Sequence, residues 1–341
     1  MTELTISSQP LRAGSGRLPR VALALAVFAL GFAVPALLDQ GYLLSILNKG
    51  LLLGILALGI AFLMHQCGLV LFGIASFYGV GAYGFAILTE TGGLPGLPAA
   101  ILAIALCGAF SFLVGAVIVR TRPLAFMMIT LALGELLRHL TSIPELRGIT
   151  HGVDGMIVNF QGTILGYEVF DFLDPAVFWP FVWTAACGTG LMMWLVANSM
   201  VGRTLRAIKE NEERMRFCGF GTYLPRLLAF SLAGSIAGIA GVLQALASGF
   251  VSPELFGLVT STNALLAAIT GGLASIAGPV LGGVAFAAAL DEFGALGYSQ
   301  LFTGIAVVVV IVAMPRGLVV TLGTILPGLL ARFAGKGRDD A

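Results

Sequence analysis

Long apolar stretches separated by short polar segments dominate the chain. The run from Val21 to Leu38 holds 18 residues without a charge, about the length that a helix needs to cross the hydrocarbon core of a bilayer. The pattern predicts about ten spans, at residues 21–38, 42–64, 68–89, 97–119, 123–142, 176–198, 226–248, 257–272, 277–293 and 300–315. The runs are continuous, whereas barrel strands alternate apolar and polar positions. The predicted fold class is therefore an all-α, polytopic transmembrane helix bundle.

Composition supports a membrane protein and argues against other classes. Hydrophobic residues make up 58% of the 341 residues and charged residues 10%, where soluble domains carry about 25% charged residues. The formal net charge of +1 indicates no polyanion-binding surface, so nucleic acid is not expected as a partner. The four cysteines and three histidines lack the spacing of a metal site or a disulfide framework. No catalytic constellation, metal or cofactor is predicted, and the chain is not expected to be an enzyme.

The basic residues predict the orientation in the membrane. With a cytoplasmic N-terminus, all but three of the 18 lysines and arginines fall on inner segments. Arg147 lies in an outer loop, and Lys49 and Arg138 lie within spans. This distribution satisfies the positive-inside rule and places both termini in the cytoplasm. We therefore expect a disordered cytoplasmic tail at residues 1–20, a membrane domain at 21–320 and a second cytoplasmic tail at 321–341.

Two loops are long enough to have a task of their own. The outer segment at residues 143–175 is too polar to span, and either a lid, a docking surface or a plain connector would fit it. The inner loop predicts a cytoplasmic helix from Thr204 to Phe217, with Leu205, Ile208 and Met215 near one face. Its charges have both signs, whereas a lipid-bound helix favours basic residues alone. This mixture favours a protein partner.

Small and charged residues within the spans are the other candidates for function. Gly234 and Gly238 form a small-xxx-small face that predicts close helix packing. Two glycine-broken segments, at 71–83 and 270–283, each begin a span that runs outward, and such pairs point to a transport site or to packing. The candidate pathway residues are Gly73, Ser76, Gly79, Gly81, Glu135, Arg138, Gly271 and Gly272. Glu135 and Arg138, three residues apart, are expected to pair, and Lys49 needs a partner or water.

Several motifs together resemble one transporter family. They are Gly-Arg-x-Leu-Arg-Ala-Ile-Lys-Glu-Asn-Glu at 202–212, Gly-Phe-Val-Ser-Pro-Glu at 249–254 and Gly-Gly-Leu-Ala-Ser-Ile-Ala-Gly-Pro-Val-Leu-Gly at 271–282. The stretch from Lys49 to Gly317 resembles the M-type permease subunits of high-affinity branched-chain amino-acid ABC importers. The resemblance implies a bacterial inner-membrane protein, a homologous second permease, two ATP-binding subunits and a periplasmic substrate-binding protein.

The resemblance also assigns a role to the inner loop. Residues 203–219 would couple the permease to the ATPase, through Gly202, Arg203, Arg206, Glu212 and Gly219. The family usually has a polar residue where this chain has Ile74, and urea and short-chain amide permeases share the coupling motif. A urea permease is therefore the alternative, and a secondary transporter is a further one. No Gly-x-x-x-x-Gly-Lys-Ser/Thr phosphate loop occurs in the sequence, so other subunits would supply ATP hydrolysis.

Overall fold

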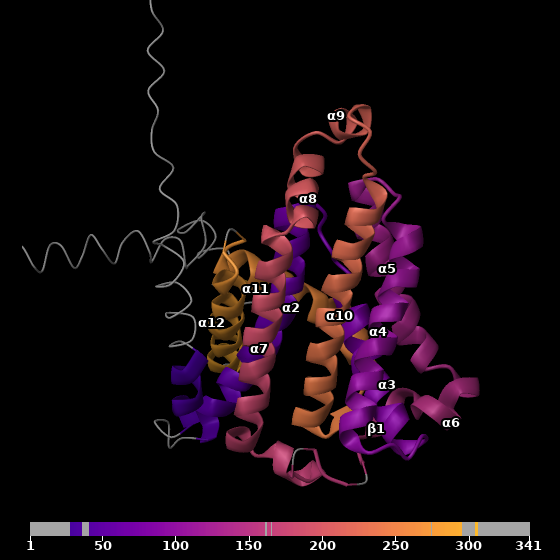
Figure 1. The fold of residues 1–341 in the computed structure, drawn as a ribbon. Helices are drawn as coiled ribbons and strands as arrows, with labels where there is room; N and C mark the ends of the chain where they lie inside the picture. The colour runs from indigo at the N-terminus through magenta and orange to yellow at the C-terminus, as the bar shows by residue number, and fades with distance from the viewer. Residues whose placement is uncertain are drawn as a thin grey trace, which may run out of the picture. The chain divides into compact units, whose positions relative to one another are not determined.

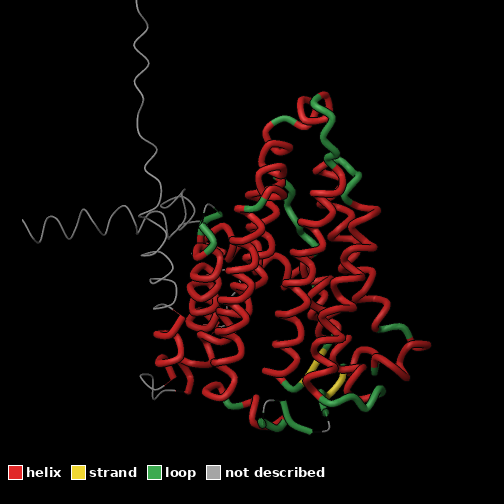
Figure 2. The backbone as a smooth tube through the Cα atoms, in the orientation of Figure 1, coloured by secondary structure: helices red, strands yellow, loops and turns green. Residues whose placement is uncertain are grey.

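The computed structural model describes residues 28–35, 41–160, 162–164, 166–273, 275–294 and 304–305. Residues 28–35 form a helix that belongs to a separate unit, Met1–Asp39, while the bundle belongs to Gln40–Ala341. The predicted span at 300–315 and both predicted tails lie almost entirely outside the described residues. The described part of the bundle is all-α apart from one two-stranded pairing (Figures 1 and 2).

The long helices follow the apolar runs closely. They are α2 (Gly41–Cys67), α3 (Ile74–Glu90), α4 (Gly96–Ile118), α5 (Pro123–Thr141), α7 (Pro175–Asn198), α10 (Tyr223–Ser248), α11 (Leu258–Gly271) and α12 (Ala277–Gly294). Of these, α2, α4, α5, α7 and α10 are long and apolar enough to cross a membrane, and α11 is a shorter apolar helix. The chain is a multi-pass membrane protein by this measure.

The core of the bundle is built around α2. In its most apolar 18-residue window 83% of the residues are buried, against 28% for α4 and 22% for α5 and α7. Helices α7, α10, α11 and α12 pack against α2, and α3, α4 and α10 pack against one another. The outer helices leave large apolar side chains uncovered, such as Leu113 and Val117 on α4. Such exposure suits a helix that faces lipid or another subunit.

Glycines allow the helices of the core to approach closely. A Cβ atom on Gly241 of α10 would overlap the carbonyl oxygen of Tyr78 on α3. One on Gly271 of α11 would overlap the backbone of Gly278 on α12. Gly234 and Gly238 face Ser111 and Cys107 of α4 in the same way, so the predicted small-residue face does pack tightly.

The two ends of the bundle carry different structures. At one end lie α6 (Arg147–Thr150), the 3₁₀ turns η1 (Pro144–Leu146), η2 (Gly152–Asp154) and η3 (Val169–Leu173), and the antiparallel strands β1 (Met156–Ile157) and β2 (Phe250–Val251). The 3₁₀ turn η4 (Pro253–Phe256) follows β2 and packs against α3 and α5. At the other end lie α8 (Met200–Glu210) and α9 (Glu212–Phe217) (Figure 1). The loop at 143–175 is therefore folded onto the bundle, with Phe160, Ile164 and Phe172 buried.

Two predicted boundaries are wrong. The third span does not begin at residue 68, because residues 68–73 are not helical and α3 starts only after Gly73. Within α3 the glycines Gly79 and Gly81 do not interrupt the helix. The predicted cytoplasmic helix at 204–217 is two helices, because the backbone of Asn211 is extended, with φ −157° and ψ 99°.

Candidate functional site

Two capping residues start helices α8 and α9. The Ser199 hydroxyl accepts a hydrogen bond from the Gly202 amide at 3.4 Å and starts α8. The Asn211 side chain accepts from the Arg214 amide at 2.8 Å and starts α9. Asparagine and serine are favoured at such positions because their side-chain oxygens bond free amides of the first turn. The segment at 204–217 contains no glycine or proline, yet the helix is interrupted at Asn211.

Helix α8 is fastened to the end of α2. The Lys209 ammonium donates hydrogen bonds to the carbonyl oxygens of Met64 at 3.2 Å and His65 at 2.9 Å. A cation at these carbonyls also complements the negative C-terminal end of the helix dipole. The Arg206 guanidinium donates to the Ala197 carbonyl at 3.0 Å, and Leu205 is buried. Lys209 thus binds α8 to α2, the central helix, and Arg206 binds it to the last turn of α7.

Helix α9 is fastened to α10 through Glu212. Its carboxylate pairs with the Arg226 guanidinium of α10 at 2.9 Å and with Arg216 at 2.7 Å, and the Thr222 hydroxyl donates to it at 3.3 Å. Partial burial alone would raise the pKa of Glu212, but the hydrogen bond and charge of Arg226, aided by Arg216 and Thr222, hold it below its ordinary value. The carboxylate stays ionised at neutral pH, and its partners are side chains of this same chain.

The α9 tip, residues 213–220, exposes two aromatic side chains among charged ones. The Phe217 side chain, at the end of α9, is 90% exposed, and Phe220 is 55% exposed. Glu213 and Arg214 are exposed beside them. Aromatic residues surrounded by a charged rim are typical of the centres of protein–protein interfaces.

A basic pocket lies behind α8 and α9. Its volume is about 470 Å³, within the range of small-molecule sites, and its lining includes Arg120, Arg122, Lys209, Arg226 and the carboxylate of Glu212. The Arg120 guanidinium also lies over the Tyr223 ring, 4.8 Å from its centroid. Five basic residues that the sequence places on the inner side line this pocket at the α8–α9 end, namely Arg120, Arg122, Lys209, Arg216 and Arg226.

A second cavity lies toward the opposite end of the bundle. Its volume is about 290 Å³. The polar residues that line it are Lys49 of α2, Tyr78 of α3, Gln244 of α10, Thr260 and Asn263 of α11 and Asp291 of α12. Lys49 lies near the start of α2, whereas Lys209 and α8 are bound to its last turn. The cavity therefore lies in the half of the bundle that faces the β1–β2 end.

The structure places the predicted pathway glycines in packing contacts. A Cβ on Gly73 would overlap the Thr130 backbone, one on Gly79 the Phe256 ring, and one on Gly81 the Gly238 backbone. Ser76 is buried and faces Gly134 of α5. Gly271 packs on α12, and Gly272 ends α11 with φ 98°. None of these six residues lines either of the two cavities described here, and their contact with a substrate stays a prediction.

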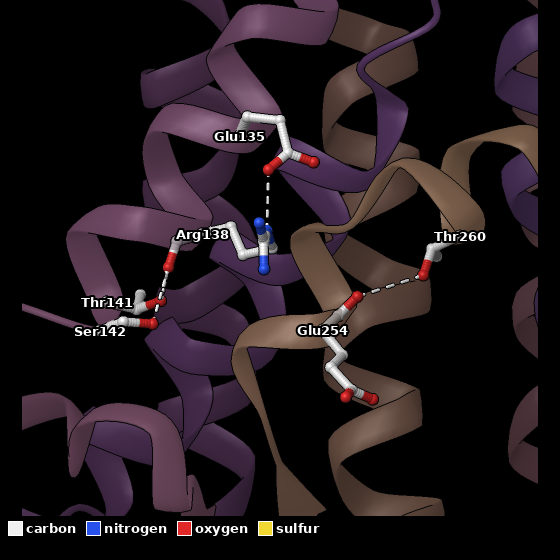
Figure 3. A network of polar contacts seen from close by, with 6 residues as sticks. All are labelled: Glu135, Arg138, Thr141, Ser142, Glu254 and Thr260. Carbon is white, nitrogen blue, oxygen red and sulfur yellow. Dashed lines mark hydrogen bonds and ion pairs between the residues drawn. The ribbon is translucent and has the colours of Figure 1, made fainter.

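The predicted ion pair within the fifth span is present. The Arg138 Nε atom lies 2.8 Å from Glu135 Oε2. The Arg138 side chain points from α5 toward the segment that carries Glu254, whose carbonyl oxygen accepts from Thr260 (Figure 3). Thr141 and Ser142 donate to the Arg138 carbonyl, at 2.9 and 3.0 Å. The two residues pair within α5, and the place of this pair in a substrate pathway stays a prediction.

Sequence reasoning noted Lys49 but missed its neighbours in the cavity. Gln244, Asn263 and Asp291 are polar residues inside predicted spans, and this is the only feature of the sequence that could have marked them as candidates for function. They are far apart in the sequence, and only the folded arrangement brings them together.

Exposed positions at the two ends allow the orientation to be measured. Cys218 beside α9 is exposed, Cys67 and Cys107 are buried, and Val153 at the other end is 74% exposed. We expect a membrane-impermeant maleimide to label a Val153→Cys, Cys218→Ser variant in intact cells, and to label Cys218 only after the membrane is permeabilised. Labelling of Cys218 in intact cells would reverse the predicted orientation.

Comparisons with known proteins agree with this architecture. The sequence pattern of the family described as branched-chain amino acid transport system / permease component matches residues 42–314. The high-affinity branched-chain amino acid transport system permease protein LivM of Escherichia coli K12 is 27% identical over 315 residues, covering 86% of this chain and 73% of that protein. The LivM protein of Salmonella typhimurium is 28% identical with the same coverage.

A shorter similarity points to another import system. The autoinducer 2 import system permease protein LsrC of Salmonella paratyphi B is 35% identical over 88 residues, which cover 26% of this chain and 25% of that protein. No solved structure matches the chain.

Proposed function

Because the chain belongs to the permease family of branched-chain amino acid transport systems, we propose that it is the membrane subunit of an ATP-driven importer for branched-chain amino acids. It would form the substrate pathway in the bacterial inner membrane together with a homologous second permease. Two ATP-binding subunits would supply the energy, and a periplasmic binding protein would deliver the substrate. The two LivM relatives are, by their names, permease proteins of high-affinity branched-chain amino acid transport systems.

The observation that carries the proposal is the α8–α9 end of the bundle. It exposes Phe217 in a charged setting, and it is tied by Lys209 to α2 and by Glu212 to α10. A partner that moves this end would therefore move α2 and α10, the two most buried of the five described helices that are long enough to span. Coupling through residues 203–219 would therefore use both α8 and α9. Arg203 and the α9 tip are the exposed groups, and Arg206 and Glu212 bind the two helices to the bundle.

This assignment changes what is expected of Glu212. The sequence suggested that its charge faces a partner, whereas the structure shows the carboxylate paired with Arg216 and Arg226. We therefore propose that Glu212 positions α9 and that the aromatic tip makes the contact. Gly202 allows the tight α7–α8 turn, since a Cβ there would crowd the Ala197 carbonyl, and Gly219, with φ 83°, ends α9.

Substrate competition tests the proposal. In vesicles that contain the permease with its partner subunits and binding protein, ATP-dependent uptake of labelled leucine should be competed by excess isoleucine and valine. Excess urea should leave it unchanged. Uptake of labelled urea without uptake of leucine would replace the proposal with the urea-permease alternative.

A further inference from the structure

We propose that the cavity lined by Lys49 and Asp291 is a transient binding site for an α-amino acid zwitterion on its way through the permease. Lys49 would hold the substrate carboxylate, Asp291 would hold the ammonium group, and leucines of α2 and α12 would contact the aliphatic side chain. The inference rests on the proposed function, because it names the chemistry by which this subunit would recognise that substrate.

The first observation is a cation without a protein partner. Within the described residues, no hydrogen bond or ion pair is recorded for the Lys49 ammonium, although Lys49 lies in the membrane-spanning helix α2. It is eight residues from Gly41, about 12 Å along the helix. A lysine at such a depth is costly and usually marks a substrate or ion pathway. An anionic group that enters the cavity would find this cation available.

The second observation is an anion on the facing helix. Asp291 of α12 lines the same cavity and accepts a hydrogen bond from the Tyr42 hydroxyl of α2. Helices α2 and α12 pack against each other, yet the described structure records no ion pair between Lys49 and Asp291. The cavity is thus lined by two opposite charges that do not pair with each other, and they are complementary to the two charges of a zwitterion.

The remaining lining separates an amino acid from other small solutes. Leu52, Leu53 and Leu56 follow Lys49 at intervals of three, four and seven residues, so they share its face of α2. Leu290 adds a further apolar side chain from α12. The cavity of about 290 Å³ is at the lower limit of ligand sites, as suits a small molecule. A neutral, wholly polar solute such as urea would leave both charges and the leucine wall unused.

Ligand analogues test the two charges separately. The assembled complex without binding protein is assayed for binding of labelled leucine, with 4-methylpentanoate, which lacks the ammonium group, and 3-methylbutylamine, which lacks the carboxylate, as competitors. Lys49→Met should weaken leucine and 4-methylpentanoate binding by about tenfold or more and leave 3-methylbutylamine unchanged, since a site built for a polar group discriminates strongly at that group. Asp291→Asn should show the reverse preference, with leucine and 3-methylbutylamine weakened.

Conservative and neighbouring variants exclude a general structural effect. Lys49→Arg should retain most of the binding, and Glu292→Gln, which changes an exposed carboxylate outside the cavity lining, should leave all three ligands unaffected. Equal weakening of all three ligands by Lys49→Met, or no weakening, would overturn the inference while leucine uptake by the wild-type complex still supports the proposed function. A wild-type complex that takes up urea but not leucine would overturn both.

Discussion

The Gly241→Ala variant is expected to lose most of its folded protein. The added methyl group would overlap the Tyr78 carbonyl oxygen and crowd the Ala82 amide nitrogen at 3.0 Å. Both are backbone atoms of α3 and cannot rotate away. Overpacking of a core usually costs about 1–3 kcal/mol, and a clash with backbone belongs at or above the upper end of that range. Thermal unfolding of the detergent-purified protein, followed by size-exclusion chromatography, measures the loss.

Gly188→Ala is the matched control for this variant. Gly188 lies in α7, and a Cβ there would meet no atom within 4 Å. Alanine is favoured over glycine in a helix by about 1 kcal/mol, so the control should unfold at the same temperature as the wild type or higher. Equal stability of the two variants would mean that α3 and α10 do not approach as closely as the structure shows.

Phe217→Asp is expected to remove most of the ATP hydrolysis that loaded binding protein stimulates in the assembled complex. The ring is 90% exposed, so its replacement should not disturb the fold of this chain. Aromatic residues at interface centres commonly contribute 2 kcal/mol or more, and a buried aspartate would add a desolvation cost. We expect a loss of roughly tenfold or more. The measurement is phosphate release by the purified complex with and without loaded binding protein.

Phe170→Asp provides the same chemical change at the other end of the bundle. Phe170 is 78% exposed in η3, on the side away from α8 and α9. It should leave the basal ATP hydrolysis of the complex unchanged. Normal stimulated hydrolysis in the Phe217→Asp complex would show that the ATP-binding subunits do not use the α9 tip.

The sequence predicts the long helices well because their ends are marked by residues with known preferences. Spans expected at 97–119, 123–142 and 176–198 appear as Gly96–Ile118, Pro123–Thr141 and Pro175–Asn198. Pro123 and Pro175 stand at first helical positions, where a missing amide costs nothing. Asp174 caps α7 by accepting from the Ala176 amide at 2.9 Å. At these helix ends, the length of the apolar run and the capping residues predict the same boundary.

The parts that escape prediction depend on tertiary contacts or on competing local signals. Asn211 sits in a run of good helix formers, yet its side chain gains a bond to the Arg214 amide by breaking the helix. The close contacts of Gly73, Gly79 and Gly81 with three different neighbours are tertiary, and the contact of these glycines with a substrate stays a prediction. The cavity lined by Lys49 and Asp291 collects residues from five helices, α2, α3, α10, α11 and α12, and no local pattern marks such a set.

The energy source of leucine uptake tests the central claim most directly. Vesicles that contain the assembled complex and loaded binding protein are given ATP inside, and leucine accumulation is recorded with and without ionophores that collapse proton and sodium gradients. The account predicts accumulation that requires hydrolysable ATP and persists when the ion gradients are removed. Accumulation that ignores ATP and disappears with the ionophores would show a secondary transporter and contradict the account.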